Sequence, residues 1–293
     1  MTTVVHFHVA DIRFAVHGPF SAAELGIRDR LNGFLTRASR GAEDVTIRWH
    51  EGDPGRTVRG EMTFDSGQTW TMYRSAGGER FIARLARRRQ PGGGRRQALV
   101  EANPTWDRIR LVERRSGPKW QSLIGLGAGE LILRNRILFL RGLVFHACGV
   151  DDAGRGILLV GHSGSGKSTQ ARLWAGTPGV TVLSDDRVAV RLDGLSPTIH
   201  GTPWGGDAGI AANRRAPLEA VLVLGQARDN SIRRLSKGEA VTELAVRAFL
   251  PFWDARLLEQ ALATVELLAT KVPVYALACR PKPDVIPLVR SIL

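Results

Sequence analysis

The residues best suited to chemistry in this chain lie in one short glycine-rich stretch. Residues 161–168 read GHSGSGKS and match the phosphate-binding pattern G-x-x-x-x-G-K-[ST] at every fixed position. Glycines let such a loop curl so that successive backbone N–H groups point inward and bind an anion. Lys167 would add a positive charge beside the outer phosphates, and the Ser168 hydroxyl would face Mg²⁺. The stretch therefore predicts a nucleotide site, with ATP and Mg²⁺ as cofactors.

The sequence on either side of the loop supplies the elements that such a loop needs. Residues 156–160 (GILLV) form a short apolar run that is typical of a buried parallel strand. Residues 169–175 (TQARLWA) favour a helix that ends before Gly176 and Pro178. The residues expected to bind nucleotide are Gly161, Ser163, Gly164, Ser165, Gly166, Lys167, Ser168 and Thr169.

Two adjacent carboxylates follow a second apolar run, at residues 180–183. Asp185 and Asp186 lie eighteen and nineteen residues beyond Lys167. Neighbouring side chains of an extended chain point to opposite sides, so the two acids should have different tasks. One can serve the metal while the other accepts the proton of an attacking hydroxyl. The alternative interpretation is an acidic turn after a strand.

His146 is a third candidate, within an apolar segment at 143–150 that predicts a strand paired in a hairpin with 156–160. The hairpin would bring His146 close to the loop and to Asp185, where it could tune a pKa or contact transferring phosphate. The alternative is a histidine that only packs in the core. Four arginines could stabilise transferring charge, and the sequence does not select among Arg214, Arg215, Arg247 and Arg256.

These motifs together resemble the HPr kinase/phosphorylase family. The likeness is carried by His146-Ala147, the apolar strand, the glycine loop and residues 183–186 (LSDD), and it covers roughly residues 140–225. The resemblance implies a nucleotide core of the type shared with phosphoenolpyruvate carboxykinase and an ATP-dependent transfer to a serine hydroxyl. It also implies that Asp185 is the proton acceptor and that Asp186 lies on the metal side. The expected catalytic residues are Asp185, His146 and Lys167, and the expected metal ligands are Ser168 and Asp186.

The region after the acid pair departs from the bifunctional enzymes of that family, which carry an acidic residue and an R-G-x-G-type stretch there. Residues 200–207 read HGTPWGGD, a form more similar to the HPr-kinase-related proteins of peptide natural-product clusters, such as lasso-peptide kinases. The departure weakens the case for a carrier-protein substrate and for phosphorylase activity. Trp204 is a candidate wall of the site or a packed turn residue, and Asp207 could supply the missing carboxylate.

Strands interleaved with helices predict an α/β fold with two domains. Residues 116–293 would form a P-loop kinase core of the HPr kinase/phosphoenolpyruvate carboxykinase type. Residues 1–115 predict a smaller α+β module that could recognise substrate, with hairpins, a helix after residue 20 and single strands. Residues 84–96, rich in arginine and holding a proline and three glycines, predict a mobile basic loop. A single helix is expected over 122–140.

Composition limits the classes of partner. The chain has 293 residues, 43% of them hydrophobic, and 41 Lys and Arg against 28 Asp and Glu give a net charge of +13. The excess of positive charge favours polyanionic partners. The basic stretch 84–96 has no aromatic residues among its arginines to stack on bases, which argues against a nucleic-acid partner. The sequence shows neither a membrane-spanning apolar run nor a secretory signal, so a cytoplasmic protein without a membrane partner is expected. Cys148 and Cys279 lie in apolar runs and are expected to be buried.

The leading prediction is an ATP-dependent kinase that phosphorylates a Ser or Thr hydroxyl of a peptide or protein. The acceptor would be acidic or end in serine, for example a ribosomal natural-product precursor peptide. Two alternatives stay open: a kinase for a small molecule such as free serine, and a nucleotide-gated binding module without phosphotransfer. The identity of the acceptor, a homo-oligomeric state and the role of residues 1–100 are not fixed by the sequence.

Overall fold

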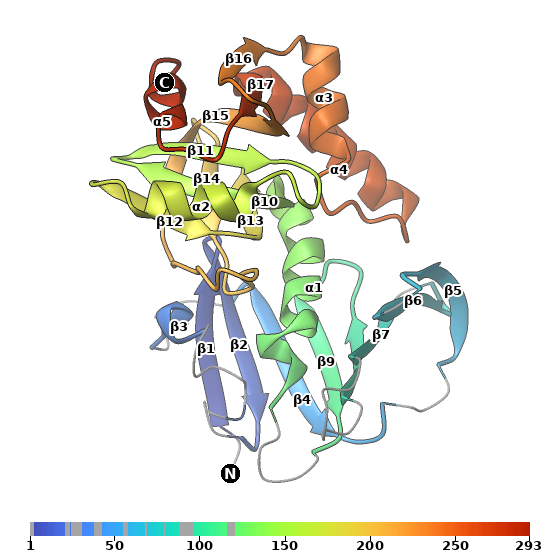
Figure 1. Cartoon of the computed structure of the whole chain (residues 1–293). Coiled ribbons are helices and arrows are strands. Elements are labelled where there is room, and N and C mark those ends of the chain that lie inside the picture. The colour runs from blue at the N-terminus through green and yellow to red at the C-terminus, as the bar shows by residue number, and fades with distance from the viewer. Residues whose placement is uncertain are drawn as a thin grey trace. The chain divides into compact units, whose positions relative to one another are not determined.

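Figure 1 shows the computed structural model of the chain. It describes residues 3–20, 24, 31–37, 43–54, 58–67, 69–78, 80–87, 96–115 and 121–293. The chain divides into two compact units, Met1–Arg136 with Pro251–Ala255 and Ile137–Leu250 with Arg256–Leu293. Each unit is built on one large sheet, which makes the fold mixed α/β. The sequence put the boundary at 115/116, whereas the compact units divide at 136/137.

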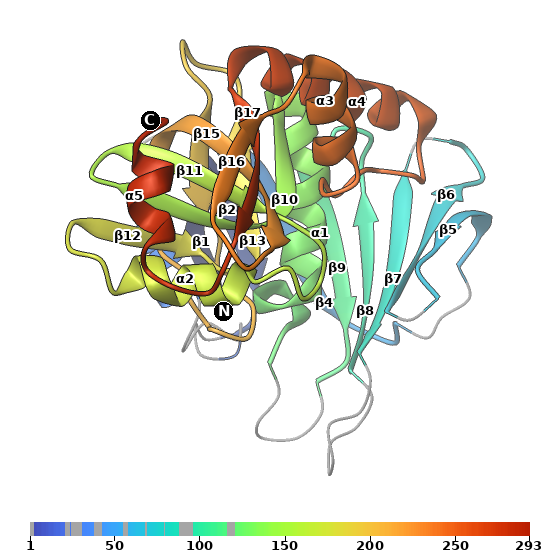
Figure 2. The same cartoon turned by 45° about the horizontal axis from the view of Figure 1, so that its top comes forward.

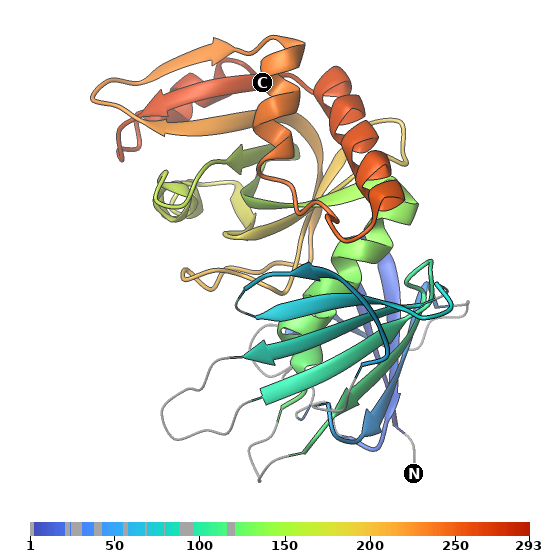
Figure 3. The same ribbon diagram turned by 90° about the vertical axis from the view of Figure 1, so that its right-hand side faces the viewer.

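The first unit is a nine-stranded sheet with the strand order β3-β1-β2-β4-β9-β8-β7-β6-β5. The strands are β1 Thr3–Val9, β2 Ile12–Gly18, β3 Leu35–Thr36, β4 Val45–Glu51, β5 Gly60–Asp65, β6 Trp70–Ser75, β7 Phe81–Arg87, β8 Arg96–Ala102 and β9 Arg108–Glu113. Their side chains alternate: in β4, Ile47 is buried and Arg48 is exposed. Helix α1, Gly127–Arg136, runs along one face of this sheet (Figures 2 and 3). The apolar side chains of the strands therefore form a core under α1.

Several elements of the first unit agree with the sequence prediction. The hairpin of β1 and β2 turns at Ala10 and Asp11, whose φ angles of 53° and 58° suit a two-residue turn. The hairpin of β5 and β6 is confirmed as well. The helix expected after residue 20 falls largely on residues outside the described part of the chain.

Two predictions in this unit need correction. The basic stretch 84–96 is not a loop at its ends, because β7 extends to Arg87 and pairs with β8 from Arg96 onward. Residues 88–95 lie outside the described residues. The helix expected over 122–140 is interrupted at Leu126, whose φ and ψ of −125° and −128° are not helical. A 3₁₀ turn, Leu123–Gly125, precedes the break, and α1 begins after it.

The second unit is an eight-stranded sheet with the order β11-β10-β13-β14-β15-β17-β16, in which β12 pairs with β10 and β11 also pairs with β15. The strands are β10 Gly142–Asp152, β11 Arg155–Val160, β12 Val180–Ser184, β13 Arg187–Arg191, β14 Thr198–Gly201, β15 Arg215–Gln226, β16 Ser231–Arg234 and β17 Val274–Cys279. The helices are α2 Lys167–Ala175, α3 Lys237–Ala245, α4 Ala255–Lys271 and α5 Val285–Arg290. The sequence did not predict β14, β16 or α5.

The expected hairpin around the glycine loop is confirmed, since β10 and β11 pair antiparallel with Ala147 opposite Val160. On its other side β11 runs parallel to β15. Helices α2 and α5 lie on the same side of the sheet (Figure 1) and share one apolar core with it, formed by residues such as Cys148, Leu159, Trp174 and Val285. This core fixes the start of α2, and with it the glycine loop.

The C-terminal helix, α5, is held to β10 by Asp152, which is only 1% exposed. Arg290 donates to both carboxylate oxygens at 2.7 and 2.9 Å, and Arg155 adds a third hydrogen bond at 3.0 Å. The hydrogen bonds from Arg290 hold the pKa of Asp152 below its usual range, although burial acts against them. The carboxylate therefore stays charged in the fold at neutral pH.

Arg290→Ala is expected to reduce the free energy of unfolding by about 1–3 kcal/mol at pH 7, because the buried carboxylate keeps only Arg155. A lowered pKa stabilises the fold above the unfolded pKa of about 4, and this contribution is lost as the pH falls through the folded pKa. The difference between wild type and variant should therefore shrink in acid. Urea titrations at several pH values measure it. Arg280→Ala, which removes an exposed pair with Asp284, should change stability by less than about 1 kcal/mol.

No helix among the described residues is long and apolar enough to cross a membrane.

Candidate active site

The glycine loop joins the end of β11 to the start of α2. Gly164 and Gly166 have φ angles of +78° and +101°, a conformation that favours glycine. A Cβ on Gly161 would lie 2.3 Å from the Ser165 hydroxyl oxygen, so that position also depends on glycine. Gln226, at the end of β15, donates to the Gly164 carbonyl at 2.7 Å. The loop therefore has the curled backbone that presents N–H groups to an anion at a helix start.

Lys167 lies inside this curl. Its ammonium donates to the carbonyls of Gly161 and His162 at 2.8 and 2.9 Å, and the residue is 7% exposed. Burial lowers the pKa of Lys167, Asp186 opposes that shift, and the positive charge of Arg247 adds to it. An ammonium has three donors, so Lys167 can hold the loop and still reach a ligand.

The sheet brings the loop and the acid pair to one edge. Strands β11 and β12 both pair antiparallel with β10, so they run parallel to each other on its two sides. Ala147 of β10 lies opposite Val160, and Gly149 lies opposite Ser184. The Ala147 N–H also donates to the Asp186 carbonyl at 3.0 Å. The ends of β11 and β12 are thus two strand spacings apart, about 10 Å, with β10 between them.

Asp185 is turned away from solvent and is 3% exposed. Its two carboxylate oxygens accept the backbone N–H groups of Gly206 and Ala208, each at 2.9 Å. A Cβ on Gly206 would lie 3.0 Å from the Asp185 carboxylate and 2.9 Å from the Asp186 side chain. The glycine-rich segment 205–209 therefore holds this carboxylate in one orientation, a contact that sequence reasoning missed.

Asp186 points the other way, as expected for adjacent residues. Its carboxylate contacts His146 Nδ1 at 2.6 Å and Arg187 at 2.5 Å. Burial raises the pKa of Asp186, but the hydrogen bond with His146 and the charge of Arg187 outweigh it and hold the pKa below its usual range. The sequence placed His146 near Asp185, whereas its contact is with Asp186. The reason is register: β10 and β13 pair His146 directly opposite Arg187, the residue after Asp186.

Two arginines join the site. Arg247 is buried after α3, where it contacts the His162 ring at 3.2 Å and the Glu243 carbonyl at 2.7 Å. Among the four arginines that the sequence left open, Arg247 is the one that contacts the glycine loop, while Arg214, Arg215 and Arg256 are exposed. Arg187, which sequence reasoning missed, lies 4.7 Å over the Phe249 ring. Its position directly after the acid pair was the available signal.

The segment after the acid pair is anchored by Thr202, whose hydroxyl donates to the Arg187 carbonyl at 2.7 Å. Trp204 is buried in this segment, and Asp207 is exposed.

The two cysteines are free and buried, as predicted. Burial and the charge of Asp185 raise the pKa of Cys148, which keeps this thiol protonated.

The donor set at this edge suits a hard cation. Asp186 is ionised at neutral pH, and Ser168, half-buried in the first turn of α2, adds a hydroxyl oxygen. Mg²⁺ prefers oxygen ligands of this kind together with phosphates and water. Within the described residues, no three His, Cys, Asp or Glu side chains gather as a metal cluster.

Comparison of the chain with protein-family models finds no match, and neither does comparison with curated proteins.

Proposed function

We propose that this chain is an ATP-dependent kinase that transfers the γ-phosphate to a Ser or Thr hydroxyl of a peptide or protein. The observation that carries the proposal is the meeting of two groups at one sheet edge. A curled glycine loop with a buried lysine ends β11, and the Asp185–Asp186 pair follows β12 two strands away. Phosphoryl transfer needs such a pairing of a phosphate cradle with carboxylates.

The nucleotide would be held by the loop. The N–H groups of residues 161–166 and the first turn of α2 would bind the phosphates, and Lys167 would neutralise their charge. Ser168 and Asp186 would hold Mg²⁺, which when bound screens the charge between the outer phosphates. His146 acts as a positioning residue because its ring fixes the Asp186 carboxylate.

The proton of the acceptor would pass to Asp185. The hydroxyl oxygen attacks the γ-phosphorus, the bond to the bridging oxygen of ADP breaks, and the hydroxyl proton moves to the Asp185 carboxylate. The N–H groups of Gly206 and Ala208 orient this carboxylate before the acceptor binds. Arg247 and Arg187 would stabilise the charge on the transferring group, since both lie beside the loop or the acid pair.

The proposal includes a core of the HPr kinase/phosphoenolpyruvate carboxykinase type, a cytoplasmic location and an acidic or serine-terminated acceptor. The net charge of +13 supports an acidic acceptor. A second function, nucleotide-gated binding without phosphotransfer, is favoured by one observation. Asp185 is 3% exposed beneath the segment 205–209, so an acceptor reaches it only if that segment moves.

The test is an assay of the purified chain with Mg²⁺ and γ-labelled ATP. The acceptors are acidic peptides ending in serine, the same peptides with the serine replaced by alanine, and free serine. We expect label on the serine peptides alone, and none with Lys167→Ala. Tight ATP binding without transfer to any acceptor would select the binding module instead. Transfer to free serine alone would select a small-molecule kinase.

A further inference from the structure

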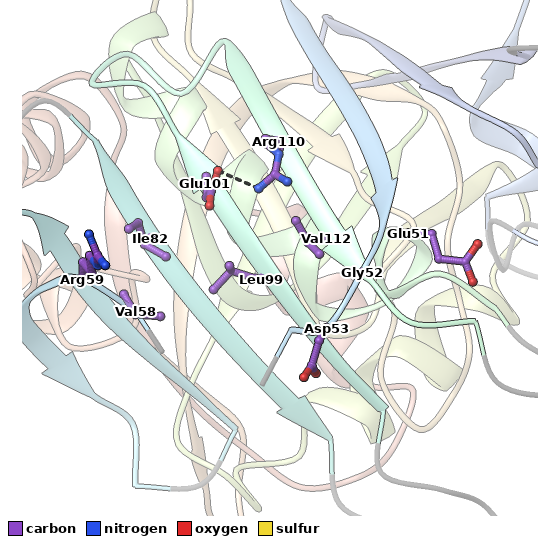
Figure 4. Close-up of a pocket in the computed structure, with 10 residues that line it drawn as sticks. All are labelled: Glu51, Gly52, Asp53, Val58, Arg59, Ile82, Leu99, Glu101, Arg110 and Val112. Atoms are coloured by element: carbon purple, nitrogen blue, oxygen red, sulfur yellow. Dashed lines mark hydrogen bonds and ion pairs between the residues drawn. The ribbon is translucent and has the colours of Figure 1, made fainter. Parts of the chain in front are cut away.

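The open face of the first unit's sheet carries two adjoining hollows. One, of about 820 Å³, has a floor of Ile82, Leu99 and Val112, as Figure 4 shows. The other, of about 890 Å³, is lined by residues that include Arg48 and Arg108. Both are lined by Glu101 and Arg110. The two hollows adjoin at these two residues and together lie over β4, β9, β8 and β7, and we call them the sheet trough.

The basic end of the sheet trough follows from strand register. Arg48 of β4 lies directly opposite Arg110 of β9, and on its other side it lies opposite His17 of β2. Arg110 is paired with Glu101 at 3.1 Å, and Arg108 lies opposite Thr46. Like charges directly opposite each other destabilise a sheet. Glu101 offsets the charge of Arg110, and an anionic ligand would offset the positive charge of Arg48 and Arg108 in the same way.

The middle of the sheet trough is apolar, and its far end carries Asp53, whose carboxylate is paired with Arg114 at 3.3 Å. Leu99 and Val112 lie opposite each other on β8 and β9. Figure 4 shows them between the Glu101–Arg110 pair and Asp53. Glu51 and Arg59 line the same hollow and add one charge of each sign. The sheet trough thus has a basic end, an apolar middle and a far end where charges of both signs lie.

We infer that the sheet trough binds an extended peptide in which acidic and apolar residues alternate. Its carboxylates would lie over Arg48 and Arg108, and its apolar side chains would contact Leu99 and Val112. The basic and apolar zones follow one another along the strands: from Arg108 to Val112 of β9 is four residue steps, about 13 Å, or roughly four extended residues of a bound peptide. The inference rests on the proposed function for its role, because the bound segment would belong to the acceptor.

A nucleic acid fits the sheet trough less well than a peptide. Binding of single strands relies on aromatic side chains that stack with bases. The described residues that line the two hollows include no Phe, Tyr or Trp. A peptide of acidic and apolar residues can instead place its carboxylates at the basic end and its apolar side chains on Leu99 and Val112.

The test is fluorescence anisotropy without ATP. The probe is a labelled peptide of about eight residues that alternates Glu and Leu around a central Ser, and a matched probe carries Gln in place of Glu. Arg48→Glu/Arg108→Glu should weaken binding of the Glu probe by about tenfold or more, as expected for losing two ion pairs. The control Arg234→Glu/Lys271→Glu reverses two exposed charges in the second unit and should change affinity by less than about twofold.

The outcomes separate this site from the proposed function. Equal loss in the control pair, or equal binding of the Gln probe, would overturn the inference, as would tighter binding of an oligothymidine of similar charge. If the Glu probe binds at the sheet trough and is never phosphorylated, the site holds and the kinase proposal fails for this class of acceptor. If the Glu probe is phosphorylated with the same KM by wild type and Arg48→Glu/Arg108→Glu, the kinase holds and the site fails.

Discussion

Asp185→Asn is expected to lower kcat for phosphoryl transfer by about 10³-fold while ATP affinity changes by less than about threefold. A positioned general base contributes on the order of 10²–10⁴ to a rate, and an amide cannot take the proton. The nucleotide contacts come from the glycine loop at the other strand end, so binding should survive. Steady-state kinetics with a serine peptide and ATP titration by calorimetry measure the two effects.

The matched variant is Asp186→Asn, which changes the neighbouring acid by the same chemistry. We expect it to raise the Mg²⁺ concentration needed for half-maximal activity, because Asp186 is the ionised carboxylate that the proposed mechanism assigns to Mg²⁺ together with Ser168. Asparagine at 185 keeps one carbonyl oxygen for Gly206 or Ala208, and thermal melts of both variants check that the segment stays folded. Wild-type kcat in Asp185→Asn would remove Asp185 from the mechanism. A loss of kcat confined to Asp186→Asn would reverse the roles of the two acids.

The glycine loop and its hairpin could be predicted because their signals are local. The loop needs glycine at positions whose backbone is left-handed, and Gly164 and Gly166 have this conformation. The flanking strand is a continuous apolar run because β11 is buried between β10 and β15. Residues near in sequence make both features, so spacing alone is sufficient to find them.

The partners of the acid pair could not be predicted because they depend on long-range register. Asp185 is held by backbone groups twenty-one and twenty-three residues further on, and N–H groups leave no mark in the sequence. His146 contacts Asp186 because of the register between β10 and β13. A sequence indicates that these residues belong to one site, but it does not fix which carboxylate each of them contacts.

The strands β7 and β8 were missed for a different reason. Arginines dominate the stretch from residue 84, and their charge hides the alternation of Phe81, Ala83 and Leu85, which are buried. Arg84 lies on the opposite face, as the period of two requires.

The sequence also gives no local signal that Pro251–Ala255 belongs to the first unit. A compact unit is defined by contacts between distant parts of the chain.

Gly201→Ala should destabilise the second unit by about 3 kcal/mol or more. A Cβ at this position would lie 2.0 Å from the Ala212 carbonyl oxygen and 2.6 Å from the Leu183 carbonyl oxygen. Both are backbone atoms, so no side-chain rotation can relieve the overlap. We therefore expect a loss of stability at the upper end of the range found for overpacked cores. Urea unfolding measures the loss. The matched control is Gly238→Ala in α3, where a Cβ meets nothing within 4 Å and a gain of about 0.5–1 kcal/mol is expected.

The same substitution should also reduce catalysis, because Gly201 lies where β14 meets the strand that precedes the acid pair. Ala212 donates its N–H to the Leu183 carbonyl at 2.8 Å. A methyl group on Gly201 would overlap the carbonyl oxygens of both residues and push β12 away from Ala212. Asp185 lies two residues after Leu183, so its contacts with Gly206 and Ala208 would move with the strand. At temperatures where Gly201→Ala is still folded, kcat should fall while Gly238→Ala stays at the wild-type value. A folded Gly201→Ala with wild-type stability and kcat would contradict both the close packing of β14 on β12 and its role in placing Asp185.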